Sequence, residues 1–229
     1  MGYVAINKLS LLDYPGKISC ILFTNKCNFY CPFCHNGFTL LPSEDALDFE
    51  KDVLLFLKKR VDLLDAVVIT GGEPTLLPDL KSNIQEIKKL GFLVKIDTNG
   101  TNPELIKELL DEKLIDYIAM DVKNSPHMYP ATCGNNHVVV SNIIKSIELI
   151  KNCHIPYEFR TTLVHEFHTT TSIREMGEIL KGARKLYLQR YRLSKGVINK
   201  SLRPVDEDTA FQFVDILKDY VSEVSIRGY

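Results

Sequence analysis

The sequence predicts an α/β fold in which a mainly parallel sheet is covered by helices on its outer side. Short apolar runs rich in β-branched residues alternate along the chain with segments of helical periodicity. Polar motifs directly follow several of these runs, as expected where the carboxyl ends of parallel strands form an active-site edge. Together, the alternation and the placement of the motifs favour one sheet with a functional rim.

Seven apolar runs have the length and composition of strands, at residues 18–23, 66–70, 92–97, 114–121, 156–163, 185–192 and 223–227. Six or seven β/α units are fewer than the eight of a closed barrel. Periodicity alone leaves two architectures open, a partial barrel and a doubly wound sheet. No linker or low-complexity stretch divides the chain, so we expect a single domain over residues 1–229.

Helices between these strands are marked by their ends. Gly91 follows an apolar periodicity at the place of a C′ glycine, and Pro103 fits the first turn of the next helix. Ser172 and Glu175 form a capping-box pattern ahead of a further helix, which Gly182 ends. The predicted helices lie at residues 80–90, 103–110, 172–180 and 213–220.

The composition excludes several functional classes. Hydrophobic residues make up 45% of the 229 residues, enough for a substantial core. The net charge of −1, from 28 basic and 29 acidic residues, argues against a nucleic-acid binder. No apolar run approaches the roughly 20 residues that span a bilayer. The N-terminal residues lack a signal-peptide pattern, so we expect a cytoplasmic protein without a membrane partner.

Three closely spaced cysteines, Cys27, Cys31 and Cys34, are the most specific feature of the chain. Three thiolates on one loop can hold three irons of a cubane cluster and leave the fourth iron open to a substrate. The alternative is structural zinc with His35 as fourth ligand, although zinc ligands usually arrive as two separated pairs. The remaining cysteines show no regular framework and are interpreted as core residues or unreactive thiols: Cys20, Cys133 and Cys153.

Further polar motifs follow the predicted strands. Gly71-Gly72-Glu73-Pro74 follows the strand at 66–70, residues 97–100 end the next strand, and Asp121-Val122-Lys123 ends the one after it. Each motif alone could be a turn or a solvated loop. Because all of them are expected at one sheet edge beside the cysteine loop, a ligand site is the better interpretation. The glycines would let a ligand approach the backbone, and Glu73 would accept a hydrogen bond from an amine of that ligand.

Four other polar residues need separate interpretation. We expect His35 and Asn36 to make hydrogen bonds that support the cysteine loop, the alternative being a plain surface loop. Arg160 lies inside a predicted strand and needs a carboxylate from another strand or from a ligand, since Glu158 on the same strand offers poor geometry. The run 165–168 resembles a metal-binding pair but lacks helical i, i+4 spacing, so we expect His168 at a loop surface.

These motifs resemble a known family. Cys27-x3-Cys31-x2-Cys34, with Phe33 before the last cysteine, resembles the radical SAM superfamily signature, and residues 71–74 resemble its glycine-rich motif. The runs 34–36, 97–100 and 121–123 are similar to the glycyl-radical-enzyme activating enzymes. The opening segment 10–17 is most similar to the anaerobic ribonucleoside-triphosphate reductase activating proteins.

The resemblance implies a partial (β/α)6 TIM-type barrel, a radical SAM core, that holds a [4Fe-4S] cluster and S-adenosyl-L-methionine (SAM). It implies cluster ligation by Cys27, Cys31 and Cys34, with SAM on the open iron. The other implied roles follow the family's motifs. Phe33, Cys34 and His35 would contact the adenine of SAM, and Gly72 and Glu73 would bind its methionine amine. Asp121 and a catalytic Lys123 would line the methionine end, and Asp97 with Asp121 would hold a possible monovalent cation. Arg160 would lie on the polar inner face of the barrel, and Gln189 would contact SAM in place of a family histidine.

The implied activity is reductive cleavage of SAM, after which a 5′-deoxyadenosyl radical takes hydrogen from a glycine of a partner enzyme, with the anaerobic ribonucleoside-triphosphate reductase as the expected partner. The chain has no cysteine-rich ferredoxin-like insert, so we expect an external electron donor such as flavodoxin or ferredoxin. Three alternatives stay open: a small-molecule enzyme similar to 7-carboxy-7-deazaguanine synthase, a pyruvate formate-lyase-type activator, and a non-catalytic metal protein.

Overall fold

The structure is a computed structural model that describes residues 1–40 and 46–229. In this part of the chain eight strands form one sheet, in the order in which they follow one another along the chain. β1 is antiparallel to β2, and all later neighbours pair in parallel. The strands are β1 (Tyr3–Ser10), β2 (Ser19–Thr24), β3 (Ala66–Gly71), β4 (Leu93–Thr98), β5 (Tyr117–Asp121), β6 (Tyr157–Leu163), β7 (Lys185–Arg190) and β8 (Glu223–Arg227).

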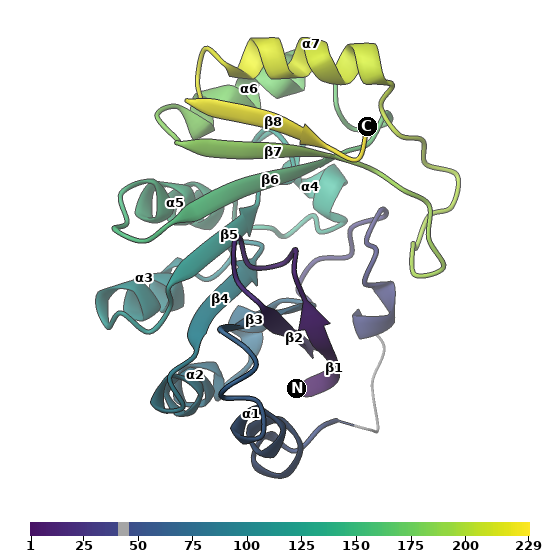
Figure 1. The fold of residues 1–229 in the computed structure, drawn as a ribbon. Coiled ribbons are helices and arrows are strands. Elements are labelled where there is room, and N and C mark those ends of the chain that lie inside the picture. Colours follow the sequence, from purple (N-terminus) through teal and green to yellow (C-terminus); the bar gives the residue numbers. More distant parts are fainter. Residues whose placement is uncertain (41–45) are drawn as a thin grey trace.

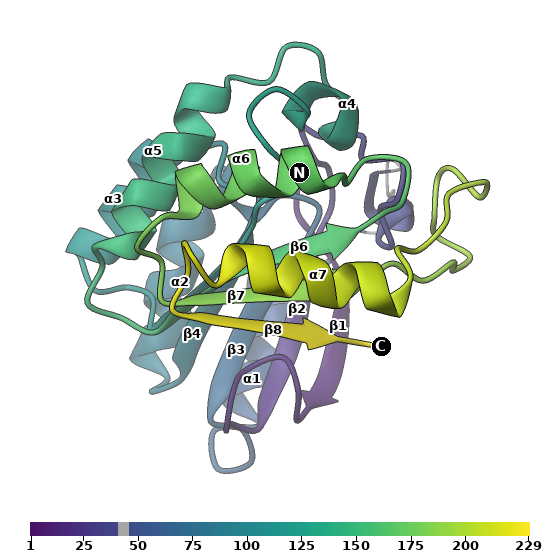
Figure 2. The same ribbon diagram turned by 90° about the horizontal axis from the view of Figure 1, so that it is seen from above.

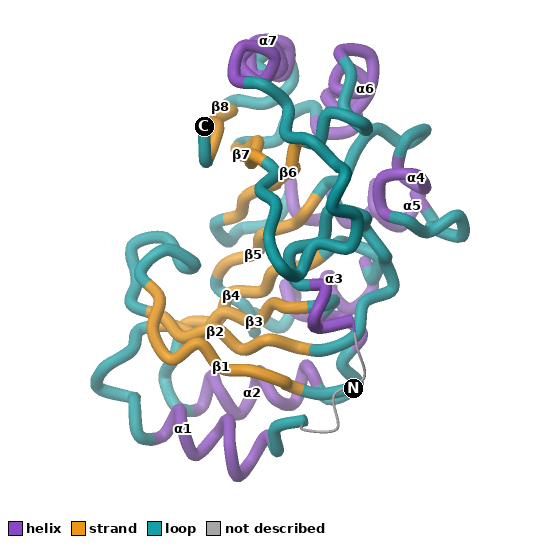
Figure 3. Tube along the Cα trace, turned by 90° about the vertical axis from the view of Figure 1, so that its right-hand side faces the viewer, coloured by secondary structure: helices purple, strands orange, loops and turns teal. Residues whose placement is uncertain are grey.

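Helices line one side of this curved sheet, as Figures 1 and 3 show. In Figure 2, α6 and α7 lie side by side, and α7 also contacts β8. No helix among the described residues is long and apolar enough to cross a membrane. The α-helices are α1 (Leu55–Lys58), α2 (Leu80–Lys89), α3 (Pro103–Asp111), α4 (Tyr129–Cys133), α5 (Val140–Lys151), α6 (Thr170–Leu180) and α7 (Glu207–Leu217). Shorter helical turns are η1 (Gly37–Leu40), the π-helix η2 (Phe49–Leu54) and η3 (Pro74–Leu76).

The strand order decides between the two architectures that the sequence left open. A doubly wound sheet reverses its strand order at a switch point, whereas here the order never reverses. β1 and β8 end the sheet as edge strands that are not paired with each other. The fold is therefore a partial TIM-type barrel, as the sequence predicted.

Two apolar clusters hold the barrel together. The larger lies between helices and sheet and includes Ile84 and Ile87 of α2, both without solvent exposure. The smaller fills part of the concave side, where Tyr14 from the β1–β2 loop meets Tyr117 edge to face at 5.7 Å. The larger cluster occupies the face of the sheet that the helices cover, so the polar residues lie on the concave face, beside the smaller cluster.

All seven predicted strands are confirmed within three residues at each end. β1 was missed, because its middle and end are partly or fully exposed and carry Asn7 and Lys8, which weakens its apolar signal. Three α-helices were also missed. The sequence indicates two long irregular segments, 35–47 and 122–140, but α4 lies inside the second and α5 begins at its end. α1 precedes β3, where no helix was predicted. Residues 41–45 of the first segment lie outside the described residues.

The helix-end predictions had mixed outcomes. Gly91 has φ +90° directly after α2, and Pro103 opens α3, as expected. The capping box predicted at Ser172 and Glu175 is wrong. Thr169 is the N-cap residue and Ser172 its partner, because Thr169 has the extended backbone of a cap while Ser172 already lies within α6.

Candidate active site

A cavity of about 420 Å³ lies on the concave side of the sheet. Every residue that the sequence assigned to the cluster and to SAM lines it: Cys27, Cys31, Phe33, Cys34, His35, Gly72, Glu73, Asp97, Asp121, Lys123 and Gln189. Arg160, for which the resemblance implied the polar inner face of the barrel, lines it as well. These side chains come from β4, β5, β6, β7 and the loops after β2, β3 and β5, so the barrel brings together residues up to 162 positions apart along the chain.

Buried aromatic rings fix the cysteine loop at the cavity wall. Phe29 packs edge to face on Tyr129 of α4, with ring centroids 6.3 Å apart, and Phe33 lies 6.2 Å from Phe167. Phe29 and Phe33 are each 4% exposed. The Cys34 amide donates to the Cys31 carbonyl at 3.0 Å, which makes a tight turn between these two cysteines. The three sulfur atoms are thus carried on a loop whose aromatic residues belong to the core.

The three thiols share one electrostatic setting. Burial raises the pKa of Cys27 to about 11 and that of Cys31 to about 12, and it also raises the pKa of Cys34. The ammonium group of Lys123 opposes this shift at all three. Cys27 Sγ also accepts hydrogen bonds from the Phe29 amide at 3.4 Å and from Asn99 Nδ2 at 3.8 Å. A positive charge and N–H donors are what thiolate ligands of a cluster require.

The glycine pair after β3 lies against the backbone that leads into the cysteine loop. The amide of Gly72 donates to Thr24 O at 2.9 Å, and that of Glu73 to Lys26 O at 2.8 Å. A Cβ on Gly72 would lie 1.8 Å from Lys26 O, so no larger residue fits here. The sequence explained these glycines by the approach of a ligand. The structure shows a second reason, the approach of the neighbouring backbone.

Glu73 is completely buried and its carboxylate is engaged inside the protein. Oε1 accepts from Thr75 N at 3.1 Å, Thr75 Oγ1 at 2.6 Å and Thr98 Oγ1 at 2.7 Å, and Oε2 accepts from Asn99 N at 2.6 Å. Burial raises the pKa of Glu73, and these donors oppose that shift. The side chain therefore joins the turns after β3 and β4. Oε2 accepts from a single protein donor, so it is the oxygen that can still accept a hydrogen bond from the methionine amine assigned to Glu73 from the sequence.

Arg160 connects the two aspartates at the carboxyl ends of β4 and β5. Its Nε donates to Asp121 Oδ1 at 2.9 Å and its Nη1 to Asp97 Oδ2 at 3.2 Å, which confirms the expected carboxylates from other strands. The distance from Nη1 to Glu158 Oε1 is 4.0 Å, the longest of these ion pairs. Two lysines complete the network, Lys95 at 3.0 Å from Asp97 Oδ1 and Lys123 at 2.9 Å from Asp121 Oδ2.

These contacts keep both aspartates charged. Burial opposes ionisation of Asp97, but Arg160 and Lys95 outweigh it and lower the pKa of this carboxyl group. Lys123 and Arg160 do the same for Asp121. Because the guanidinium already stands between the two carboxylates, a monovalent cation held by Asp97 and Asp121 stays a prediction that this geometry disfavours. Among the described residues, no three His, Cys, Asp or Glu side chains are grouped as ligands of a single ion.

His35 and Asn36 bind segments on either side of the cysteine loop. His35 Nε2 lies 2.7 Å from Arg192 O, and its ring stacks on Tyr191 at 5.9 Å. Asn36 Nδ2 donates to Gly71 O at 3.2 Å. Both residues thus support the loop, His35 by linking it to the segment after β7 and Asn36 by linking it to the end of β3, which agrees with the expected supporting role. The Nε2 atom of His35 is engaged in its contact with the backbone.

The expectation that His168 lies on a loop surface is wrong. This residue is 4% exposed, and its Nδ1 lies 3.0 Å from Val164 N. Its Nε2 lies 3.0 Å from Lys123 O, directly behind the cavity. Its apolar neighbours Val164 and Phe167 were the available signal for burial. Asp13 and Asn99 also line the cavity. They belong to the segments 10–17 and 97–100 named from the sequence, but neither had been given a role of its own.

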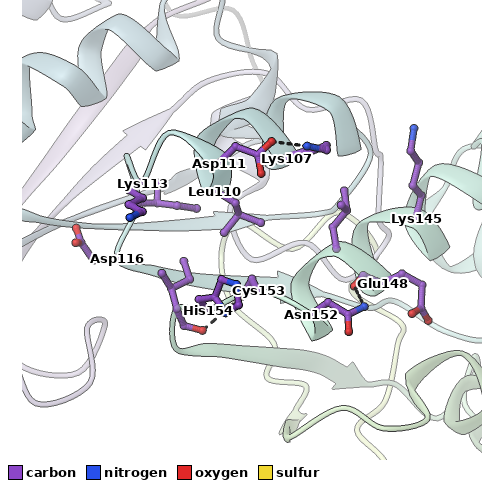
Figure 4. Close-up of a pocket in the computed structure, with 13 residues that line it drawn as sticks. Lys107, Leu110, Asp111, Lys113, Asp116, Lys145, Glu148, Asn152, Cys153 and His154 are labelled. Carbon is purple, nitrogen blue, oxygen red and sulfur yellow. Dashed lines mark hydrogen bonds and ion pairs between the residues drawn. The ribbon is translucent and has the colours of Figure 1, made fainter.

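A larger hollow of about 670 Å³ lies between α3 and α5, beside the segments that lead into β5 and β6 (Figure 4). Its rim carries Lys107 and Asp111, which form an ion pair, and its walls include Leu110 and Cys153. None of the polar motifs described above lies in it. Size therefore does not identify the functional cavity, whereas the gathering of the motifs does.

Comparisons with known proteins agree with this geometry. The model of the radical SAM superfamily matches residues 21–186. A protein of Methanocaldococcus jannaschii, named as a putative glycyl-radical enzyme activating enzyme, is 36% identical over 227 residues, which cover 96% of this chain and 92% of its relative. The 7-carboxy-7-deazaguanine synthase of Haemophilus influenzae is 29% identical over 119 residues, about half of each chain. The crystal structure of Streptococcus suis SuiB bound to S-adenosylmethionine covers 91% of this chain, which spans 52% of SuiB, with a TM-score of 0.69 and 16% identity.

The cavity fits the [4Fe-4S] cluster and the SAM that the matched superfamily uses. Three thiols line one wall beside a lysine and two N–H donors, which suits an anionic cluster with one open iron. The rest of the lining offers carboxylates, cations and glycine backbone, which suit the charged methionine end of SAM. The superfamily match favours the cluster over the zinc alternative, because members of the matched superfamily use a [4Fe-4S] cluster and the match spans all three cysteines.

Proposed function

Because this chain belongs to the radical SAM superfamily, we propose that it is an activating enzyme that generates a glycyl radical on a partner enzyme. The observation that carries this proposal is the single cavity lined by every residue expected for cluster and SAM, within a barrel whose edge strands β1 and β8 do not pair. An incompletely closed barrel can admit a loop of another protein. The full-length likeness to the Methanocaldococcus protein supports the same activity.

When bound, the cluster and SAM together supply a 5′-deoxyadenosyl radical, which removes hydrogen from a carbon atom of the substrate. The chain's own residues bind and orient. Cys27, Cys31 and Cys34 hold the cluster, and Lys123 stabilises their negative charge. Phe33 and His35 lie beside the last cysteine at the place proposed for the adenine, with Gln189 on the facing strand.

The charged network fixes the methionine end of the site. Asp97, Asp121 and Arg160 bind one another across three strands, so their polar atoms are held before SAM arrives. Such preorganisation spares the site the cost of ordering these groups on binding. In this proposal Lys123 faces the methionine carboxylate, and Glu73 holds the turn whose glycine backbone meets the methionine amine.

We propose the anaerobic ribonucleoside-triphosphate reductase as the partner, on the strength of the segment 10–17. This segment forms the β1–β2 loop, and Asp13 within it lines the cavity. The loop is held in place where Lys95 Nζ donates to Asp13 O at 2.6 Å. A partner-specific segment thus reaches the proposed reaction site. A pyruvate formate-lyase-type activator would use the same cavity with another partner.

The second candidate is a small-molecule radical SAM enzyme similar to 7-carboxy-7-deazaguanine synthase. The partial likeness to the Haemophilus enzyme favours it, but that likeness covers only 52% of this chain. The likeness to the Methanocaldococcus protein covers 96%. The activating enzyme is therefore the better supported of the two.

The test is anaerobic reconstitution with iron and sulfide, followed by dithionite, SAM and a co-expressed glycyl radical enzyme. The proposal predicts 5′-deoxyadenosine together with a glycyl-radical doublet in the EPR spectrum of the partner. Cys31→Ala should abolish both signals. Cys153→Ala, at a cysteine outside the cavity, should leave both intact. 5′-Deoxyadenosine formed equally by the Cys31→Ala protein would refute the assignment.

A further inference from the structure

The charged network at the carboxyl ends of β4 and β5 already contains its own cations. Its two aspartates present four carboxylate oxygens, and each oxygen lies within 3.2 Å of a nitrogen atom of a basic side chain. Arg160 contacts one oxygen of each aspartate. Lys95 contacts the second oxygen of Asp97, and Lys123 contacts the second oxygen of Asp121. A metal ion at these carboxylates would therefore have to share every oxygen with a cation of the protein.

Lys95 is the most deeply buried of these cations. Its side chain is 3% exposed, against 15% for the other two basic side chains of the network. Its Nζ donates to Asp13 O at 2.6 Å, lies 3.0 Å from Asp97 Oδ1, and lies 5.5 Å from the centre of the Tyr117 ring. A carbonyl oxygen, a carboxylate oxygen and an aromatic face all attract a positive charge. The ammonium group thus occupies a place whose surroundings suit a small monovalent cation.

The Oδ1 atom of Asp97 depends on this ammonium charge. It is buried, and none of the described residues donates an aligned hydrogen bond to it. The 3.0 Å contact with Lys95 is therefore an ion pair, whereas the hydrogen bond of Nζ goes to Asp13 O. A buried carboxylate that loses its counter-charge is costly. Removing the ammonium group should consequently create a demand for another cation beside Oδ1.

The network also carries a surplus of positive charge. Lys95, Lys123 and Arg160 face only the two carboxylates. Glu158 lies 4.0 Å from Arg160 Nη1, but it is paired with Arg227 at 3.3 Å, so it does not remove the surplus. One uncompensated positive charge disfavours a further cation and favours an anionic group, which the methionine carboxylate of SAM provides.

We propose that Lys95 and Arg160 are the built-in counter-ions of the SAM site, so that this protein binds SAM without a monovalent metal ion at Asp97 and Asp121. Lys95 does not line the cavity. It is a positioning residue that acts through Asp97 and through the backbone of the β1–β2 loop. The inference rests on the SAM site of the proposed function and is independent of the identity of the partner enzyme.

The first test compares SAM binding by the wild-type protein in different salts. The anaerobically reconstituted protein is placed in buffers of equal ionic strength that contain K⁺, Na⁺ or tetramethylammonium, a cation too large to approach these oxygens. Equilibrium dialysis with labelled SAM should give dissociation constants that agree within about threefold. A larger rise in tetramethylammonium would show that the site needs an alkali ion and would overturn the proposal. Absence of SAM binding in every buffer would instead count against the proposed function.

The second test uses two variants of Lys95. Lys95→Ala removes the ammonium group and opens space for a small cation, whereas Lys95→Met removes the charge but fills the space. Without cluster or SAM, Lys95→Ala should melt at a higher temperature in NH₄⁺ or K⁺ than in tetramethylammonium at equal ionic strength. Wild type and Lys95→Met should show no such difference. In tetramethylammonium, the SAM affinity of the loaded Lys95→Ala protein should fall about tenfold, and NH₄⁺ should restore it.

Lys88→Ala in α2 is the matched control. Lys88 pairs with Asp116 at 2.7 Å and is 28% exposed, and neither residue lines the SAM cavity. This variant should show no cation-specific change in melting or in SAM affinity. The proposal is overturned if Lys95→Ala melts and binds SAM alike in all buffers, or if small cations rescue Lys88→Ala or Lys95→Met equally well. If Lys95→Ala does not fold in any buffer, the comparison of salts on the wild-type protein decides.

Discussion

At the scale of single residues, the site depends on atoms that hold one another. Arg160 shows this most clearly, because one guanidinium bridges aspartates at the ends of two neighbouring strands. The sequence indicated that Arg160 needed a partner, since an arginine inside a strand is rarely unpaired. It could not indicate which carboxylates, because the pairing depends on how β4, β5 and β6 align side by side.

Removing this guanidinium should therefore destabilise the protein. Arg160→Met should lower the free energy of unfolding by about 1–3 kcal/mol, because two partly buried carboxylates would each keep a single lysine. Arg203→Met is the matched control. Arg203 pairs with Glu166 but is 66% exposed, so its loss should change stability by less than about 1 kcal/mol. Urea denaturation of both proteins measures the difference, and equal losses would contradict the role given to Arg160.

The close approach at Gly72 gives a second prediction at this scale. Gly72→Ala places a methyl group where Lys26 O lies, and backbone on both sides cannot yield cheaply. We expect a loss of about 2–3 kcal/mol in unfolding free energy and impaired cluster reconstitution, measured by thermal melting and by iron content. Gly2→Ala, whose Cβ would meet Ala46 at an ordinary 3.5 Å, should leave both unchanged. Normal iron loading of Gly72→Ala would show that this turn does not support the cysteine loop.

At the scale of elements, the sequence predicted the parallel strands well because all of them are apolar, β-branched runs and four of them, β2 to β5, also end in a polar motif. β1 was missed because an antiparallel edge strand with exposed Asn7 and Lys8 lacks that signal. In the site, too, the sequence predicted which residues are present but not how they contact one another. The motif residues were found by their type and spacing, whereas the engagement of Glu73 with Thr75 and Thr98 follows from the packing of two turns. The burial of His168 likewise depends on how the β6–α6 connection folds back onto Lys123.

The buried His168 should make the stability of the protein depend on pH. Burial lowers the pKa of His168 below its ordinary value of about 6.5, so the unfolded chain binds a proton more readily than the native one. The contribution of this residue to stability is complete above pH ~6.5 and is lost as pH falls below that value. Urea denaturation of the metal-free protein at several pH values between roughly 5 and 8 should show this loss.

A variant and its control test whether His168 causes this dependence of stability on pH. His168→Gln should flatten the dependence of unfolding free energy on pH in this range, while His137→Gln, at an exposed position, should keep it. An unchanged pH dependence in His168→Gln would assign the acid sensitivity to other groups. The measurement also tests whether the connection behind Lys123 is a stable part of the barrel.

At the scale of the whole molecule, the fold explains why these residues meet. Parallel strands with unbroken order direct their carboxyl ends to one rim, and the cysteine loop, the glycine turn and the two aspartates all follow from that rule. The edge strands β1 and β8 stay unpaired with each other, which leaves the barrel incomplete. The inner cavity is lined by residues from all of these segments.

The central claim is that this cavity removes hydrogen from a glycine of a partner protein. The most direct measurement uses a glycyl radical enzyme that contains Cα-deuterated glycine, incubated anaerobically with the reconstituted protein, SAM and reductant. Mass spectrometry then reads the isotopic content of the 5′-deoxyadenosine. The account predicts that deuterium is transferred from the partner into this product. Unlabelled 5′-deoxyadenosine, formed at the same rate with and without the partner, would contradict it.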